Sequence, residues 1–260
     1  MKNHNLVFCP HCAQEVSYSL SSECVETNVR GTEFSYVELS AYCTECSNEI
    51  YVAEINDRNV EARSEAYRLA KGLITIEEIK EMLKNCLSYE RYIHSLGTME
   101  KAMELAARFG LDIEKAQVAG LLHDCAKCIS NEELETFAHT FDESEKLSCK
   151  TWHAPVGEII AKRDYGVVDE EILSSIRWHT IGKVGMSDFE KIIFLADKIE
   201  NRTRELEFRE KIEKALNKNN SLDDAMFKSF KMTIKSLVKR KLPICFQTIE
   251  VYNDLLTKIS

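Results

Sequence analysis

The chain has little of what would place it in a membrane or outside the cell. It contains only three prolines, and no segment approaches the roughly 20 consecutive apolar residues that cross a bilayer. Its start, MKNHNLVFCPHC, has no apolar run of signal-peptide length. Positive charge is also scarce, since 34 Lys and Arg face 43 Asp and Glu, for a formal net charge of −9. We therefore expect a cytoplasmic protein that has no membrane partner and no broad attraction to nucleic acid.

Cysteine, in contrast, is abundant, with ten residues, four of which form two CxxC pairs, Cys9 with Cys12 and Cys43 with Cys46. Without a secretory signal, such pairs indicate metal ligands or reduced thiols rather than disulfides. Each CxxC turn supplies two thiolates, and a hairpin between the turns would close a tetrahedral, structural zinc site. Four unrelated reduced cysteines are the less favoured alternative. We expect Cys24 to be a buried thiol.

The pattern of the sequence changes from strand-like to helical along the chain. In EFSYVELSAY the side chains alternate as in a β-strand, whereas helical periodicity and capping boxes such as Ser187 with Glu190 begin near residue 60. We predict a mainly α protein with a small N-terminal β zinc ribbon. The predicted parts are a ribbon over 1–55, a helical connector over 56–87 with Gly72 as a stop between two helices, and a helical domain over 88–260.

His123 and Asp124, in AGLLHDCAK, end a helix that is expected to begin after Asp112. A single His-Asp couple is more often a hydrogen-bonded or capping pair than a metal site. Four further histidine and aspartate residues of the kind that bind metals lie among apolar residues. Two of them continue an apolar helix face, because His179 follows Ile176 by three positions and Asp197 follows Ile193 by four. Shared coordination of a divalent cation would satisfy these buried polar groups together. The candidate ligands are His94, His123, Asp124, His153, His179 and Asp197.

The N-terminal segment, with CPHC, CTEC and the following EIYVAEINDR, resembles the zinc ribbon of MqsA-type antitoxins, also called YgiT-type zinc fingers. In that family a helix-turn-helix DNA-binding domain follows the ribbon. No such domain follows here, so the resemblance supports the zinc site and does not imply DNA binding.

The remainder, from about residue 88 to 260, resembles the YqeK-type symmetrical diadenosine tetraphosphatases of the HD-domain phosphohydrolases. The landmarks are RYIHSLG, AGLLHDCAK, WHAPVGEII, RWHTIGKVGMS and LADKIE. The resemblance implies an all-helical bundle in which the six candidate ligands hold two metal ions, commonly iron, with manganese as an alternative. It also implies cleavage of diadenosine tetraphosphate into two ADP by a water that the metals deliver as hydroxide.

The same resemblance implies roles for single residues. Asp124 would bridge the two ions as a catalytic ligand, and Lys127 would serve in catalysis and contact phosphate. The family's Pro-Gly-Arg-like turn is replaced here by IENRTRE, so Arg202, Arg204 or neither contacts the substrate, and Arg202 is our first choice. Cys125 stands where the family often has an aromatic residue.

Several alternatives stay open. Cys125 and Cys128 form a third CxxC, for which two packed thiols are favoured over redox sensing or a further metal. The enzyme could act on another nucleotide, or the chain could be a regulator that works through its ribbon. The ribbon's partner and the oligomeric state, a homodimer included, cannot be derived from the sequence.

Overall fold

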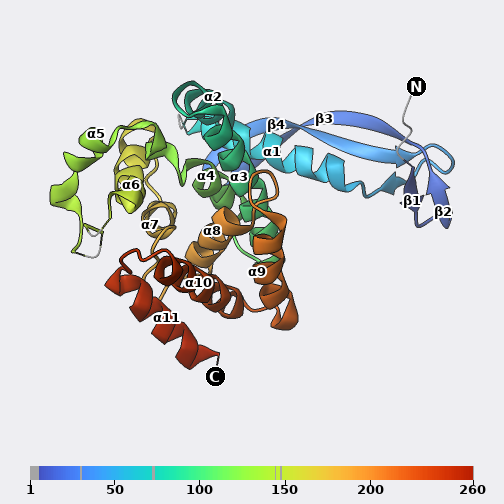
Figure 1. The fold of residues 1–260 in the computed structure, drawn as a ribbon. Helices are drawn as coiled ribbons and strands as arrows, with labels where there is room; N and C mark the ends of the chain where they lie inside the picture. The colour runs from blue at the N-terminus through green and yellow to red at the C-terminus, as the bar shows by residue number, and fades with distance from the viewer. Residues whose placement is uncertain (1–5, 30, 72–73, 144, 147, 260) are drawn as a thin grey trace. The chain divides into compact units, whose positions relative to one another are not determined.

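The protein, described by a computed structural model over residues 6–29, 31–71, 74–143, 145–146 and 148–259, divides into two compact units, 1–76 and 77–260. It is mainly helical with a small β region at the N-terminus, which confirms the predicted fold class (Figure 1). The predicted stop at Gly72 lies outside the described residues.

The first unit is built on a long antiparallel hairpin. Its strands are β1 (Val7–Cys9), β2 (Gln14–Val16), β3 (Tyr18–Val29), β4 (Thr32–Cys43) and β5 (Glu49–Ile50). β3 and β4 pair along their whole length, from Tyr18 opposite Cys43 to Val29 opposite Thr32. The hairpin fills the interval between the two CxxC pairs, as the alternation in EFSYVELSAY predicts, and it brings the second pair back to the first.

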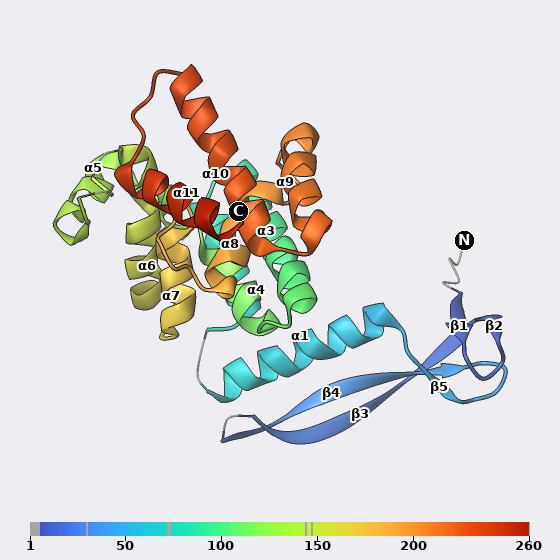
Figure 2. The same ribbon diagram turned by 90° about the horizontal axis from the view of Figure 1, so that it is seen from below.

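Helix α1 (Ala53–Ala70) lies along this hairpin (Figure 2). The Asn59 amide accepts a hydrogen bond from the Leu39 N–H and donates one to the Leu39 carbonyl, both at 2.8 Å, and so satisfies backbone groups on the edge of β4. Nearer its C-terminal end, Tyr67 meets Phe34 edge to face, with ring centroids 5.8 Å apart. These contacts make α1 part of the first unit, whereas the sequence assigned residues 56–87 to a separate connector.

The core of the first unit is small. It consists of Cys9, Val16, Ala41, Cys43, Ile50, Val52 and Ile55. Two of these are predicted zinc ligands, so a metal would contribute a large part of the folding free energy of this unit. The expectation that Cys24 is buried is wrong, because Cys24 pairs with Val37, itself 56% exposed, on a part of the hairpin that is open to solvent.

The second unit is helical throughout the residues described. Its elements are α2 (Ile76–Cys86), α3 (Tyr89–Phe109), α4 (Ile113–Leu122), η1 (Cys125–Cys128), α5 (Asn131–Glu135), η2 (Ala138–Thr140), η3 (Cys149–Thr151), α6 (His153–Asp164), α7 (Glu170–Trp178), α8 (Asp188–Ile199), α9 (Leu206–Asn219), α10 (Leu222–Lys239) and α11 (Phe246–Lys258).

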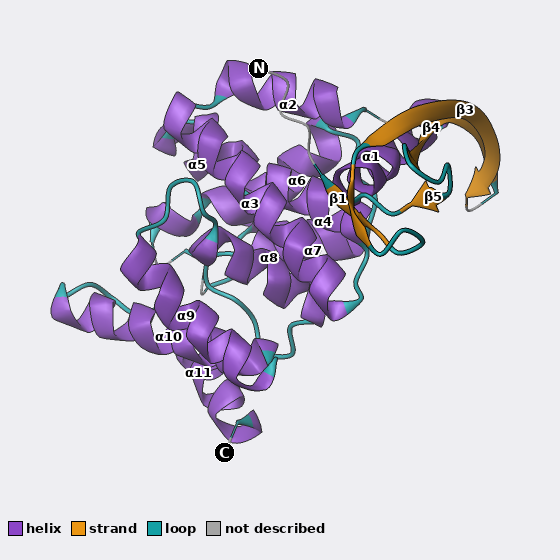
Figure 3. Ribbon diagram, turned by 90° about the vertical axis from the view of Figure 1, so that its right-hand side faces the viewer, coloured by secondary structure: helices purple, strands orange, loops and turns teal. Residues whose placement is uncertain are grey.

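Helix α8 is the centre of this unit, and it packs against α3, α4, α7 and α10 (Figure 3). Most of its residues are buried, including Phe189, Ile193 and Leu195. The predicted capping box starts the helix, since Ser187 accepts from the Glu190 N–H and the Glu190 carboxylate accepts from the Ser187 N–H. α8 therefore has a defined start and a fixed rotation, which positions the residues near its C-terminal end.

Helices α3 and α4 approach each other closely at Gly120. A Cβ at this position would lie 2.7 Å from the Met99 Cα, so only glycine allows the two backbones to lie this near. The Asp112 side chain caps α4 by accepting from the Lys115 N–H at 3.0 Å, which confirms the predicted start after Asp112. The close packing brings the end of α4 beside the first half of α3.

Within the described residues, no helix has both the length and the apolar character required to pass through a bilayer. This finding agrees with the absence of long apolar runs in the sequence.

Candidate metal centre

Helices α3 and α8 bring His94 and Asp197 together. The His94 Nε2 atom lies 2.9 Å from Asp197 Oδ1, and both side chains are buried. His94 comes from the first half of α3, and Asp197 lies near the C-terminal end of α8, on the face that continues from Ile193. The sequence predicted this placement of Asp197 from the four-residue spacing.

His123 and Asp124 reach the same place because α4 ends between Leu122 and His123. The His123 Nδ1–H donates to the Gly120 carbonyl at 2.8 Å, which directs Nε2 toward His94 Nε2 at 3.3 Å. Asp124 already has a non-helical backbone, with φ −107 and ψ 17. The change of conformation lets two consecutive side chains, which would diverge on a continuous helix, share one site.

His153 and His179 complete the cluster from helix ends. His153 is the first residue of α6 and His179 follows the last residue of α7. Their Nε2 atoms are 3.3 Å apart, and Asp124 Oδ1 lies 3.2 Å from the His153 Nε2 and 3.5 Å from the His179 Nε2. The two histidines therefore form a second group around the same carboxylate.

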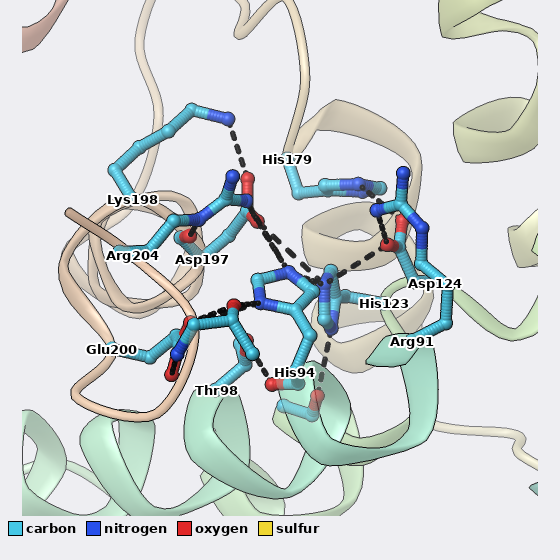
Figure 4. Close-up of polar contacts among 12 residues, drawn as sticks. Arg91, His94, Thr98, His123, Asp124, His179, Asp197, Lys198, Glu200 and Arg204 are labelled. Carbon is cyan, nitrogen blue, oxygen red and sulfur yellow. Dashed lines mark hydrogen bonds and ion pairs between the residues drawn. The ribbon is translucent and has the colours of Figure 1, made fainter. Parts of the chain in front are cut away.

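Asp124 is common to both groups. One group is His94, His123 and Asp124, the other is Asp124, His153 and His179, and within each group the candidate ligand atoms lie within 4.8 Å of one another. Figure 4 shows the imidazoles of His94, His123 and His179 gathered with Asp124 and Asp197. All six residues are buried, with at most 5% of their surface exposed. Imidazole nitrogens mixed with carboxylate oxygens suit iron, manganese or zinc better than magnesium.

Comparisons with known proteins agree with this geometry. Residues 91–202 match the model of the HD domain. The symmetrical bis(5'-nucleosyl)-tetraphosphatase of Bacillus subtilis is 38% identical over 188 residues, which are 70% of this chain and 97% of that protein.

This chain belongs to the symmetrical bis(5'-nucleosyl)-tetraphosphatase family. The tetraphosphatase of Staphylococcus aureus is 31% identical over 183 residues, 69% of this chain and 94% of that one. A crystal structure from Clostridium acetobutylicum, described as a predicted HD superfamily hydrolase involved in NAD metabolism, superposes with a TM-score of 0.65 at 34% identity. The superposed region covers 72% of this chain and 100% of the chain in that crystal structure. The remainder of this chain is additional to these relatives.

In a tetraphosphatase-family protein, the HD domain implies a divalent metal ion at this site. The protonation states suit such an ion. Burial lowers the pKa of His123 to about 3 and that of His153 to about 4, so both imidazoles are neutral near pH 7. Burial alone would raise the pKa values of Asp124 and Asp197. Neighbouring imidazoles outweigh this effect at both residues, together with two basic side chains at Asp197, and both pKa values lie well below the usual range. Neutral imidazoles and ionised carboxylates are the forms that bind metal.

Glu200 is a buried carboxylate of this site that the sequence reasoning missed. Its Oε1 lies 3.2 Å from His94 Nδ1, and it also accepts from the N–H groups of Arg202 and Thr203. A carboxylate on the outer ring nitrogen fixes which nitrogen faces a metal. The available signal was the spacing, since Glu200 follows Asp197 by three positions in LADKIE.

Basic side chains surround the two aspartates. Arg91 donates to Asp124 Oδ2 at 3.2 Å, Lys198 donates to Asp197 Oδ2 at 2.5 Å, and Arg204 donates to Asp197 Oδ1 and, at 2.6 Å, to the Asp197 carbonyl. Arg91, which the sequence reasoning missed, precedes His94 by three positions and so lies on the same helix face. The site therefore combines an anionic interior with a cationic margin that could receive a polyphosphate.

The two predicted substrate contacts have different positions. Lys127, on η1, is partly buried, and burial lowers its pKa. Among the described residues no hydrogen bond or ion pair holds its ammonium group. Arg202 is not brought to the cluster, because its guanidinium pairs with Glu100 on the outer side of α3. The turn after α8 instead places Arg204 there, beside a pocket of about 450 Å³ that is also lined by Arg91 and His94.

The four cysteines of the CxxC pairs meet in the first unit, separately from the HD cluster. The Cys9 and Cys46 sulfurs are 3.7 Å apart, and those of Cys12 and Cys43 are 3.8 Å apart. Zinc bonded tetrahedrally to sulfur at about 2.3 Å requires sulfur separations of about 3.8 Å, so the arrangement fits. The Cys12 N–H donates to the Cys9 sulfur at 3.4 Å, and the Glu45 N–H donates to the Cys43 sulfur at 3.3 Å.

Proposed function

We propose that this chain hydrolyses diadenosine tetraphosphate symmetrically, to two ADP, at a centre of two transition-metal ions. The observation that carries the proposal is the position of Asp124, whose carboxylate is shared between His94 and His123 on one side and His153 and His179 on the other. A shared carboxylate between two histidine pairs is the arrangement expected of a dinuclear site. Iron is the metal we favour, with manganese as the alternative.

We assign Asp197 to the ion held by His94 and His123, because its Oδ1 lies 2.9 Å from the His94 Nε2 and 3.8 Å from the His123 Nε2. When bound, the ions would acidify a water molecule and offset the negative charge that develops on the phosphoryl group. The chain itself orients the ligands. Glu200 contacts the His94 Nδ1, and the Gly120 carbonyl accepts from the His123 Nδ1–H, so the Nε2 atoms of both rings are directed inward.

We propose that Lys127, Arg91 and Arg204 bind the phosphate chain of the substrate. Lys127 supports this role because its ammonium, partly buried near Asp124, is without an ion-pair partner among the described residues. Arg91 and Arg204 line the pocket of about 450 Å³ beside His94, and pockets of roughly 300–1,000 Å³ are typical for small ligands. We favour Arg204 over Arg202, because the pairing with Glu100 holds Arg202 away from the cluster.

The test is turnover of a nucleotide panel, with products separated by anion-exchange chromatography. We expect diadenosine tetraphosphate to be the best substrate and ADP to be the only nucleotide product. Asp124→Asn should lower kcat by at least about 1,000-fold, since it weakens a ligand shared by both groups. The matched control is Asp188→Asn, which changes an exposed carboxylate in the first turn of α8 and should alter kcat less than about twofold.

Formation of ATP and AMP would contradict symmetrical cleavage. Faster turnover of a mononucleotide would support the alternative of a phosphohydrolase with another substrate. A metal-loaded protein that turned over no nucleotide would support the regulator.

We also propose that Cys9, Cys12, Cys43 and Cys46 hold one structural zinc ion. The support is the pair of sulfur separations, 3.7 and 3.8 Å, together with a closed set of four thiols that leaves no position for a substrate.

A further inference from the structure

Helix α10 leaves the core of the helical unit about halfway along its length. Its buried residues end at Phe230, and no residue of the helix from Lys231 to Lys239 is buried. Figures 2 and 3 show this end of α10 projecting beyond the helices beside it. The second half of α10 therefore presents a long surface to solvent.

This surface is strongly basic, although the chain as a whole is acidic. Residues 225–249 contain six Lys and Arg and no Asp or Glu, in a chain with a net charge of −9. Four of the six form what we call the lysine stripe: Lys228, Lys231, Lys235 and Lys239. Intervals of three and four positions keep these side chains on one face of the helix. At 1.5 Å per residue the stripe is about 16 Å long.

The lysine stripe faces away from the core. At 3.6 residues per turn, its centre lies on the side of α10 opposite the buried Met226 and Phe230. Arg240 and Lys241 follow the stripe directly and are also exposed. Six cations are thus collected at one projecting helix end.

The charges of this surface are not neutralised within the described part of the chain. No side-chain hydrogen bond or ion pair there engages Lys228, Lys235, Lys239, Arg240 or Lys241. The ammonium of Lys231 lies over the ring of Phe227, 5.8 Å from its centroid, and this contact leaves the positive charge in place.

Lysines on the adjoining helices behave differently. Lys211 pairs with Glu207 on α9, and Lys258 pairs with Asp254 on α11. On α10, in contrast, Lys235 stands four positions from a lysine on each side, a spacing at which like charges destabilise a helix. The helix dipole favours cations in the last turn alone, so it does not account for the rest of the stripe.

We propose that the lysine stripe is a binding site for duplex DNA, which it contacts through the phosphate backbone without reading the base sequence. A row of unpaired lysines complements a row of phosphates, and such contacts carry no sequence information. The inference goes beyond nucleotide hydrolysis and does not depend on the proposed substrate. Since the whole chain is acidic, the contact is confined to this one face and is sensitive to salt.

Other polyanions fit the stripe less well. An interfacial helix inserts an apolar face into a membrane, but the apolar face of α10 is already buried in the protein. Single-stranded nucleic acid is bound by stacking on free aromatic rings, whereas Phe227, beside the stripe, already stacks on Tyr252 with centroids 5.1 Å apart. The major groove of B-form DNA, about 12 Å wide, admits a helix of about 10–12 Å, and the narrow groove of A-form RNA does not.

Fluorescence anisotropy of a labelled DNA duplex of random sequence, titrated with the full-length, metal-loaded protein, tests the proposal. In about 50 mM KCl we expect a Kd of roughly 1–50 µM. Because about four phosphates are neutralised, the slope of log K against log salt should be about −3 to −4. The affinity should therefore fall roughly 100-fold between about 50 and 200 mM KCl.

A double variant identifies the surface that binds. Lys231→Gln with Lys235→Gln removes two exposed cations of the stripe and should weaken binding at least about 10-fold, with a slope shallower by about 2. The matched control is Lys214→Gln with Lys218→Gln, which makes the same change of net charge at exposed positions of α9. It should alter Kd less than about threefold, because charges away from the contact are screened. Circular dichroism checks that both variants keep their helices.

An RNA duplex of equal length, and vesicles of phosphatidylcholine with phosphatidylglycerol, should bind the protein more weakly than DNA does. The proposal is overturned if the DNA duplex does not bind at low salt, or if the control pair weakens binding as much as the stripe pair. Tighter binding of the RNA or of the vesicles through the stripe would also overturn it.

Discussion

At the scale of single residues, the metal centre depends on which ring nitrogen each histidine presents. His123 and His179 are oriented by backbone carbonyls, those of Gly120 at 2.8 Å and Ile176 at 2.7 Å. His94 differs, because its Nδ1 faces the carboxylate of Glu200. Glu200 is fully buried and is itself held by the backbone of the turn after α8. Its ionised carboxylate therefore fixes His94 and connects it to that turn.

We expect Glu200→Gln to lower both metal affinity and kcat/KM by roughly 10–100-fold, the usual effect of losing a carboxylate that orients a ligand histidine. The matched control is Glu100→Gln, because Glu100 pairs with Arg202 from the neighbouring surface and is half exposed. That variant should retain wild-type metal content and activity within about twofold. Metal titration and steady-state kinetics on both variants test this prediction. Equal effects of the two substitutions would contradict the role given to Glu200.

The histidines also predict how the metal-free protein responds to acid. Burial lowers the pKa of His123 to about 3 and of His153 to about 4, whereas the unfolded chain takes up these protons near pH 6.5. As the pH falls below about 6.5, the unfolded state therefore binds protons that the folded state does not, and stability is lost. Burial would lower the pKa of His94 too, but Asp197 and Glu200 outweigh it and raise that pKa, which offsets part of the loss.

We expect the free energy of unfolding of chelator-treated protein to fall by on the order of 2 kcal/mol between pH 7 and pH 5. Urea unfolding followed by helical circular dichroism measures it. His123→Gln should make the dependence shallower, and a free energy that rose on acidification would refute the assignment of neutral, buried imidazoles.

At the scale of the elements, most of the candidate ligands lie near helix ends. The starts of the helices are the features that the sequence predicted best. The cap at Asp112 and the capping box at Ser187 could be predicted because they are local patterns of neighbouring residues. The faces that carry His179 and Asp197 followed from three- and four-residue spacings. The spacing from Asp197 indicated Glu200, but neither its contact with His94 nor the position of Arg204 could be predicted, because both depend on how the turn after α8 folds back onto α3.

The contact between α3 and α4 should be the most sensitive to added volume. A Cβ at Gly120 would lie 2.7 Å from the Met99 Cα, whereas one at Gly157 would meet the Ile176 side chain at 3.2 Å. We expect Gly120→Ala to destabilise the helical unit by about 2–3 kcal/mol and to weaken metal binding through His123. Gly157→Ala should stay within about 1 kcal/mol of wild type, because a side chain can move and alanine favours the helix. Chemical denaturation of both variants gives the comparison, and the reverse order would contradict this packing.

At the scale of the whole molecule, the chain combines a β unit with a helical unit, and the match to the HD domain lies in the helical unit. The sequence identified both, from the CxxC pairs and from the HD motifs. It placed residues 56–87 in a connector, whereas in the structure α1 contacts β4, and the contact of Asn59 with Leu39 joins residues that are 20 positions apart. Periodicity shows that a helix forms, but it does not show which surface the helix covers.

The small core of the β unit makes its folding depend on metal. We expect Cys46→Ser to lose one zinc per chain and to make the region 6–71 sensitive to protease, while the circular dichroism of the helical unit persists. Ser21→Ala, an exposed change on β3, should keep the zinc and the protease resistance. Elemental analysis and limited proteolysis test this, and a protease-resistant, zinc-free Cys46→Ser protein would show that the cysteines are not required.

The most direct test of the account is an anomalous-difference map from crystals of the iron- or manganese-loaded protein. The account predicts two peaks with Asp124 between them. One peak should lie beside the Nε2 atoms of His94 and His123 and the other beside those of His153 and His179, each at roughly 2.0–2.2 Å from its ligand atoms. A single peak, or peaks away from Asp124, would contradict a shared dinuclear centre.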